Sequence, residues 1–283
     1  MNVALYVLIF IMGSFVGSFL TLATYRIPLN QDITHKRSYC PNCNHRLEFL
    51  DLIPVFSYIF LGAKCRYCKK RISPRYFLIE TCCGLLFIFF AWALNFNVYD
   101  GLNIIQIVEF VLISLYIIFL FLVGQIDKER GIIDKRVIIY GFLISILKVL
   151  FDYFISKNQN ITYNLNRIII YLLIILILNI ISIKRKGKEN YYISLMIICA
   201  IMSIFTYEIT TILSIIYAIL IVAIKLLIDN VVNKKNKTIS KERVKMPVTF
   251  YLAISNIIIV IIAILCKWGY KWEWEKVKKE KLH

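Results

Sequence analysis

Residues 104–126 read IIQIVEFVLISLYIIFLFLVGQI, and this stretch decides the fold class. A helix rises about 1.5 Å per residue and the hydrocarbon core of a bilayer is about 30 Å thick, so a run of this length is long enough to cross a membrane. A spanning β-strand would alternate apolar and polar residues, whereas this run is almost continuously apolar. The stretch therefore predicts a transmembrane helix and excludes a β-barrel.

Further runs of the same kind occur along the chain. They cover residues 3–23, 77–96, 137–155, 165–183, 191–206, 209–228 and 248–266. The chain is 60% hydrophobic and 18% charged, whereas a soluble domain has about 45 to 50% apolar and about 25% charged residues. We therefore predict an all-α, polytopic membrane protein with about eight transmembrane helices. Because only a few polar residues separate the sixth run from the seventh, one long tilted helix over 191–228 is an alternative.

Composition divides the chain into parts. Residues 1–28 form a first span, and we expect no removable signal peptide because its apolar run is too long and lacks a basic leader. Residues 29–76 are polar, basic and rich in Cys and Pro, which predicts a small soluble insertion. Residues 77–266 form a membrane domain with the remaining spans, and residues 267–283 form a basic, aromatic tail.

The distribution of basic residues predicts the orientation. Of the 34 Lys and Arg residues, 24 lie in the loops after the first, third, fifth and seventh runs. Cytoplasmic loops retain an excess of Lys and Arg, so these loops, including the insertion at 29–76, are expected in the cytoplasm. The net charge of +17 indicates contact with anionic lipid rather than with nucleic acid.

Two C-x-x-C turns lie within the insertion. Cys40 and Cys43 form the first and Cys65 and Cys68 the second, a spacing that allows four thiolates to surround a zinc ion. Thiols stay reduced in the cytoplasm, so a metal site is favoured over a disulfide pair. Four sulfur ligands leave no position for water, which predicts a structural zinc. So short an insertion cannot bury a sufficient core, and metal binding would provide the missing folding free energy.

Several acidic residues lie in or beside the apolar runs, where charge is costly. Glu80, Glu109 and Asp152 fall within runs or at their ends, and Asp127 follows the third run at the predicted cytoplasmic surface. Spacing alone leaves two interpretations of Asp127, a functional carboxylate or a residue that simply ends the helix. Asp134 precedes the fourth run and is expected to cap that helix through its free N–H groups.

A series of ordered motifs resembles the type IV prepilin peptidase family. The motifs are Gly17-Ser18-Phe19-Leu20, Tyr25-Arg26-Ile27-Pro28, the paired C-x-x-C turns, Ile53-Pro54-Val55-Phe56-Ser57-Tyr58, Ile72-Ser73-Pro74-Arg75-Tyr76 with Glu80, Ile126-Asp127 with Ile133-Asp134, and Met246-Pro247-Val248-Thr249-Phe250. The resemblance implies a multi-pass aspartic protease of the bacterial inner membrane. It would cut the basic leader from type IV prepilins or pseudopilins on the cytoplasmic face. It also implies methylation of the new N-terminus with S-adenosylmethionine in forms that carry the cysteine loop.

Within this resemblance, Asp127 matches the first catalytic aspartate of the family. The second is expected in a Gly-x-Gly-Asp motif, and the corresponding stretch here is Gly187-Lys188-Glu189-Asn190, with Asn190 at the aspartate position. An amide cannot exchange a proton near neutral pH. Glu189, one residue away, is the candidate second carboxylate.

Three functions therefore stay open. The first is a working peptidase that uses Asp127 with Glu189, or with a more remote acidic residue that the fold brings near. The second is a degenerate member that has lost proteolysis and retains methylation or pilin binding. The third is a non-enzymatic assembly partner whose zinc loop docks another protein.

Overall fold

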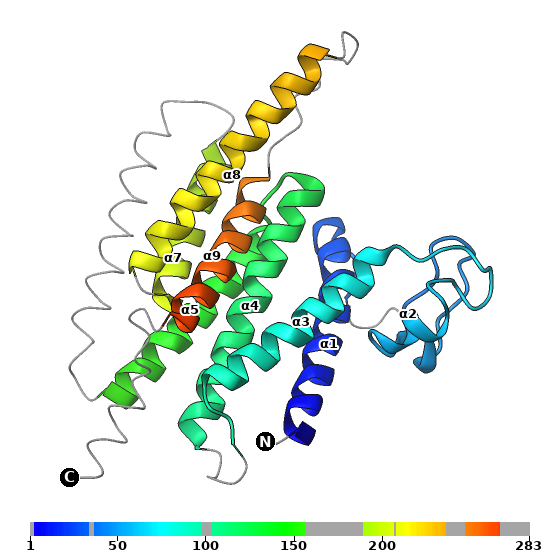
Figure 1. Cartoon of the computed structure of the whole chain (residues 1–283), viewed down its shortest axis with the longest axis horizontal. Coiled ribbons are helices and arrows are strands. Elements are labelled where there is room, and N and C mark those ends of the chain that lie inside the picture. Colours follow the sequence, from blue (N-terminus) through cyan, green and yellow to red (C-terminus); the bar gives the residue numbers. More distant parts are fainter. Residues whose placement is uncertain are drawn as a thin grey trace. The chain divides into compact units, whose positions relative to one another are not determined.

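The computed structural model of the chain describes residues 3–33, 37–97, 103–156, 189–206, 208–235 and 247–266. Within these ranges the structure is helical, and its only β-pairing consists of isolated bridges, which confirms the predicted all-α class. Six of the described helices are long and apolar enough to cross a membrane. They are α1 (Val3–Arg26), α3 (Pro74–Ala93), α4 (Ile104–Arg130), α5 (Lys135–Ser156), α8 (Glu208–Lys235) and α9 (Val248–Leu265) (Figure 1).

The region predicted as either two spans or one long helix forms two helices. α7 (Glu189–Phe205) ends before a bend at Thr206, and α8 begins at Glu208. The Thr206 hydroxyl donates to the Met202 carbonyl at 2.8 Å and lies 2.7 Å from the Thr211 hydroxyl. The single long helix is therefore wrong, because the chain bends at Thr206 between two separate helices. The predicted span at 165–183 lies outside the described residues.

Two helix boundaries differ from the apolar runs. α3 begins at Pro74, three residues before its run, because Pro favours the first helical position and the Ser73 side chain accepts the Arg75 N–H at 3.4 Å. α4 continues through Arg130, so Asp127 lies inside its last turn rather than after it. Gly131 then ends α4 with a φ of 63°, and its N–H donates to the Asp127 carbonyl at 2.7 Å.

The chain forms two compact units, Met1–Ser114 and Leu115–His283. In the first unit α1 packs along α3 (Figure 1). Gly13 and Gly17 lie four residues apart on α1, and a Cβ at Gly17 would lie 2.9 Å from the Glu80 Cα. A Cβ at Gly13 would lie 2.9 Å from the Gly84 Cα. Small residues therefore allow the two backbones to approach, as in many membrane helix pairs.

Gly17→Ala is expected to destabilise the first unit by about 1–3 kcal/mol, because the new methyl group would overlap the α3 backbone. The loss should appear as a lower unfolding temperature in detergent. Met12→Ala is the matched control, since Met12 is exposed on the same helix. An unfolding temperature for Gly17→Ala equal to that of Met12→Ala would contradict this view of the interface.

The second unit contains a buried polar chain between helices. The Tyr116 hydroxyl of α4 donates to Asn256 Oδ1 of α9 at 2.8 Å, and Asn256 Nδ2 donates to Ser214 Oγ of α8 at 3.3 Å. α8 also packs along α9, and α5 packs along α7. These contacts fix α9 against α4, which positions the beginning of α9 beside Asp127.

Candidate functional site

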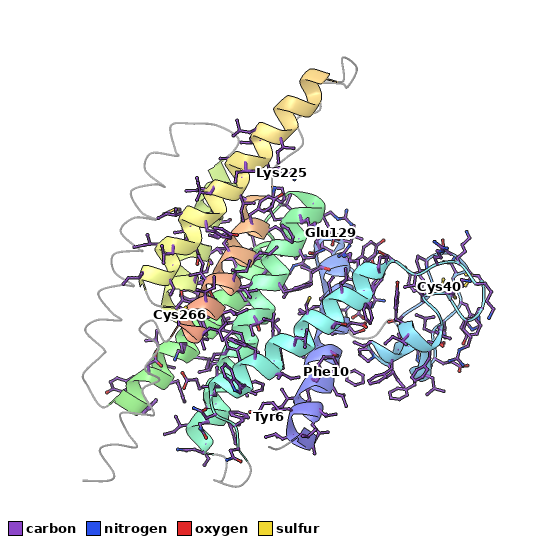
Figure 2. The ribbon with its side chains drawn as sticks, in the orientation of Figure 1. Tyr6, Phe10, Cys40, Glu129, Lys225 and Cys266 are labelled. Carbon is purple, nitrogen blue, oxygen red and sulfur yellow. The ribbon has the colours of Figure 1, made fainter. Side chains whose placement is uncertain are left out.

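The four predicted zinc ligands come together in the loop between α1 and α3, and Figure 2 labels Cys40 there. The four Sγ atoms lie within 4.8 Å of one another. Both turns have the same backbone pattern. The Cys40 N–H donates to the His45 carbonyl at 2.9 Å, and the Cys40 carbonyl accepts from the Asn44 N–H at 2.8 Å. The Cys65 N–H donates to the Lys70 carbonyl at 2.9 Å, so each C-x-x-C is a closed knuckle.

The sulfur positions fit a metal ion. Sulfurs about 2.3 Å from a tetrahedral zinc lie about 3.8 Å from each other, and the Cys40 and Cys68 Sγ atoms are 3.9 Å apart. Asp51 braces the second knuckle, since its carboxylate lies 2.8 Å from Arg66 Nε and accepts the Tyr67 hydroxyl at 3.2 Å. The cluster can therefore hold a tetrahedral metal such as zinc.

The pKa values of Cys40 and Cys43 are shifted in opposite directions. Burial works to raise the pKa of Cys40, but backbone N–H groups of Asn42 and Cys43 and neighbouring thiols lower it to about 7. The backbone at His45 lowers the pKa of Cys43, while burial, hydrogen bonds with Cys40 and Cys68, and the Cys40 charge raise it to about 11. Neighbouring thiolates thus repel each other, and a bound cation would relieve this repulsion.

Asp127 is buried at the end of a span, with only 1% of its surface exposed. Its Oδ2 accepts two hydrogen bonds from Thr249, one from the backbone N–H at 2.9 Å and one from the hydroxyl at 2.7 Å. Thr249 lies in the first turn of α9, just after Pro247 and Val248. The Asp127 carboxylate therefore lies at the N-terminal end of α9, where a helix presents backbone N–H groups that have no partner within the helix.

The sequence alone does not identify Thr249 as the partner of Asp127. Its only signal in the sequence is its place in the Met246–Phe250 motif. Close packing supports the contact, because a Cβ at Gly124 of α4 would lie 3.2 Å from the Phe250 Cα. The Lys128 Nζ also lies 4.3 Å from the centre of the Phe250 ring.

Other acidic residues beside the spans have structural partners. Asp134 accepts the Arg136 N–H at 2.9 Å immediately before α5, which confirms the predicted cap. Its hydrogen bonds to the Arg136 side chain hold its pKa below the usual value. Asp152 pairs with Lys148 at 2.7 Å, one helical turn away. Asp127 thus differs from Asp134 and Asp152 in being buried and in accepting its hydrogen bonds from the first turn of another helix, α9.

Glu189 and Asn190 form the beginning of α7. Their side chains lie outside what the structure describes, so a pair of Asp127 with Glu189 stays a prediction.

The described residues define an all-helical, multi-pass membrane protein with a four-cysteine loop between α1 and α3 and a buried aspartate at the end of α4. Residues 11–94 match the family model described as the bacterial peptidase A24 N-terminal domain. The resemblance to prepilin peptidases predicted from the motifs is confirmed by this match and by the relatives that follow.

The chain is similar to curated proteins named prepilin leader peptidase/N-methyltransferase. The protein of Myxococcus xanthus is 38% identical over 140 residues, which cover 50% of this chain and 39% of the relative. The protein of Dichelobacter nodosus is 28% identical over 183 residues, which cover 54% of this chain and 60% of the relative. The protein of Vibrio cholerae is 30% identical over 153 residues, which cover 51% of this chain and 56% of the relative. The match thus spans about half the length of these relatives. No solved structure matches the chain.

Proposed function

We propose that this protein is an aspartic endopeptidase of the bacterial inner membrane that cuts the leader from type IV prepilins or pseudopilins on the cytoplasmic face. The observation that carries the proposal is the buried Asp127 carboxylate, held by Thr249 at the beginning of α9. The relatives' names support the same activity. The proposal also includes a cytoplasmic position for the loop at 29–76, as the basic residues predict.

The chemistry requires two carboxylates that share one proton. Both Thr249 donors bond to Asp127 Oδ2 and fix the orientation of the carboxylate. In the proposed pair Asp127 is the base that takes a proton from the attacking water. Glu189, in its protonated form, is the acid that donates to the carbonyl oxygen of the scissile bond. The Asn190 amide can orient that carbonyl by a hydrogen bond but cannot transfer the proton.

The four-cysteine loop has a structural role in this account. Cys40, Cys43, Cys65 and Cys68 would hold one zinc ion, and the zinc would cross-link the two knuckles. A second activity, transfer of a methyl group from S-adenosylmethionine to the new N-terminus, is proposed from the relatives' names alone.

A degenerate member without protease activity is the competing function, and Asn190 is the observation that favours it. The test is to co-express the chain with each prepilin of its own bacterium and to measure the mass of the pilin N-terminus. Loss of the leader supports the peptidase. A pilin that keeps its leader contradicts it, and methylation of a pilin supplied without its leader would then assign the transferase role alone. Absence of cleavage, transfer and pilin binding would leave the non-enzymatic assembly role.

A further inference from the structure

The segment between the two knuckles is unusually apolar for a loop. Residues 52–63 read LIPVFSYIFLGA and contain no charged residue, whereas basic residues dominate the rest of the loop. The segment begins at the last residue of the 3-10 helix η2 (Phe49–Leu52) and includes the short helix α2 (Phe56–Phe60). η2 and α2 together carry six exposed apolar side chains: Phe49, Leu50, Leu52, Phe56, Ile59 and Phe60.

These side chains are as exposed as those on the spans. Phe60 is 82% exposed and Phe49 is 74% exposed, and Phe60 is the most exposed large apolar side chain of the described residues. Contiguous exposed apolar surface on a protein marks a contact with another protein, with a ligand or with a membrane. The position of the segment in the first unit decides between these possibilities.

Two contacts hold the segment against the side of α3. The Val55 N–H donates to Glu80 Oε2 at 2.8 Å, and both residues are buried. The Tyr58 ring stacks on Phe77 with ring centres 5.2 Å apart. Since Glu80 lies six residues after Pro74, it is about 9 Å along the helix from the beginning of α3. The loop has therefore folded back beside a membrane span, as Figure 1 shows for α2 and α3.

The backbone of this segment suits a position at the edge of the bilayer. Val55 has a φ of 66°, which is strained for a β-branched residue, and the Phe56 N–H closes a γ-turn on the Pro54 carbonyl at 2.7 Å. Glu80 satisfies the Val55 N–H in that turn, and the Ser57 and Ile59 N–H groups bond back to Ile53 and Val55. Paired backbone groups are what a segment in contact with lipid requires.

Basic residues flank the apolar segment. Lys64, Arg66, Lys69, Lys70 and Arg71 follow it and are exposed. An apolar face beside Lys and Arg side chains is typical of elements that lie in the interface of an anionic membrane.

We propose that η2 and α2 form an interfacial anchor whose Phe49, Phe56, Ile59 and Phe60 side chains insert into the lipid leaflet on the loop's own side of the membrane, with the flanking basic residues against anionic headgroups. The occupant of the apolar surface is bilayer lipid. The proposal does not depend on the peptidase activity proposed above, and it adds contact with lipid to the contacts that already hold the four-cysteine loop against α3.

The test places the photoreactive amino acid benzoylphenylalanine at position 60 of the full-length protein in vesicles of phosphatidylethanolamine and phosphatidylglycerol. Position 39 is the matched control, because Tyr39 is also an exposed aromatic residue of the loop. After irradiation, mass spectrometry should find a phospholipid adduct at position 60 in at least about fivefold excess over position 39. Equal labelling at both positions, no lipid adduct at position 60, or a cross-link to a second copy of the chain would overturn the anchor.

The same protein in vesicles of phosphatidylcholine alone tests the role of charge. The adduct yield at position 60 should fall, because the basic flank then meets no anionic headgroup. An unchanged yield would overturn the electrostatic part of the proposal.

Discussion

Asp127→Asn is expected to lower the rate of prepilin cleavage by about 10²- to 10⁴-fold, the contribution of a general acid or base. The substitution removes the group that takes the proton from water. It keeps an oxygen that can accept the Thr249 N–H and hydroxyl, so α4 and α9 should stay packed. The measurement is the rate of leader removal in vesicles, together with the unfolding temperature. Wild-type cleavage by Asp127→Asn would contradict the assignment of Asp127.

Variants of Thr249 test the same carboxylate without changing it. Thr249→Val keeps the backbone N–H bond and removes the hydroxyl bond to Asp127. It should lower cleavage by about 10- to 150-fold, because a hydrogen bond to a charged group is worth about 1.5–3 kcal/mol. Thr249→Ser restores the hydroxyl and is the control. If both variants cleave equally fast, the hydroxyl has no part in the site.

Cys65→Ser is expected to remove the bound metal and to unfold the loop between the spans. Zinc binding supplies about 10–16 kcal/mol in small zinc-finger peptides, which is more than so small a segment could gain from its own core. Purified wild-type protein should contain about one zinc per chain. Removing the zinc with a chelator should have the same effect as the substitution, and trypsin should then cut the loop at its Lys and Arg residues.

Cys82→Ser is the matched control for the metal site, since Cys82 is exposed on α3 and lies outside the cluster. It should keep both the zinc and the resistance to trypsin. A Cys65→Ser protein with full zinc content would contradict the four-sulfur site. A loop that stays resistant without metal would contradict the structural role.

Features with a local cause could be predicted from the sequence. The spans follow from long apolar runs, and the knuckles follow from the spacing of Cys40 with Cys43 and of Cys65 with Cys68, because each pair needs only a few neighbouring residues to form its turn. The Asp134 cap is equally local. In each case the physical requirement lies within a short stretch of chain.

Features that depend on distant contacts could not be predicted in this way. The hydrogen bonds between Thr249 and Asp127 join residues 122 positions apart. The contact of Glu80 with Val55 joins residues 25 positions apart and depends on a backbone turn with positive φ that a valine rarely adopts. The start of α3 and the end of α4 also differ from the ends of their apolar runs. Ser73 and Gly131 set these helix ends by capping, and hydropathy does not detect capping.

The most direct test of the central claim, that Asp127 and Glu189 form the catalytic pair, is the cleavage rate of Glu189→Gln beside the natural sequence and Asn190→Asp. The natural sequence should cleave its prepilin, and Glu189→Gln should be slower by about 10²- to 10⁴-fold. Cleavage by Glu189→Gln at the natural rate would contradict the pair. An inactive natural sequence that gains activity in Asn190→Asp would contradict it as well, and would assign this chain a peptidase scaffold whose second carboxylate was lost at residue 190.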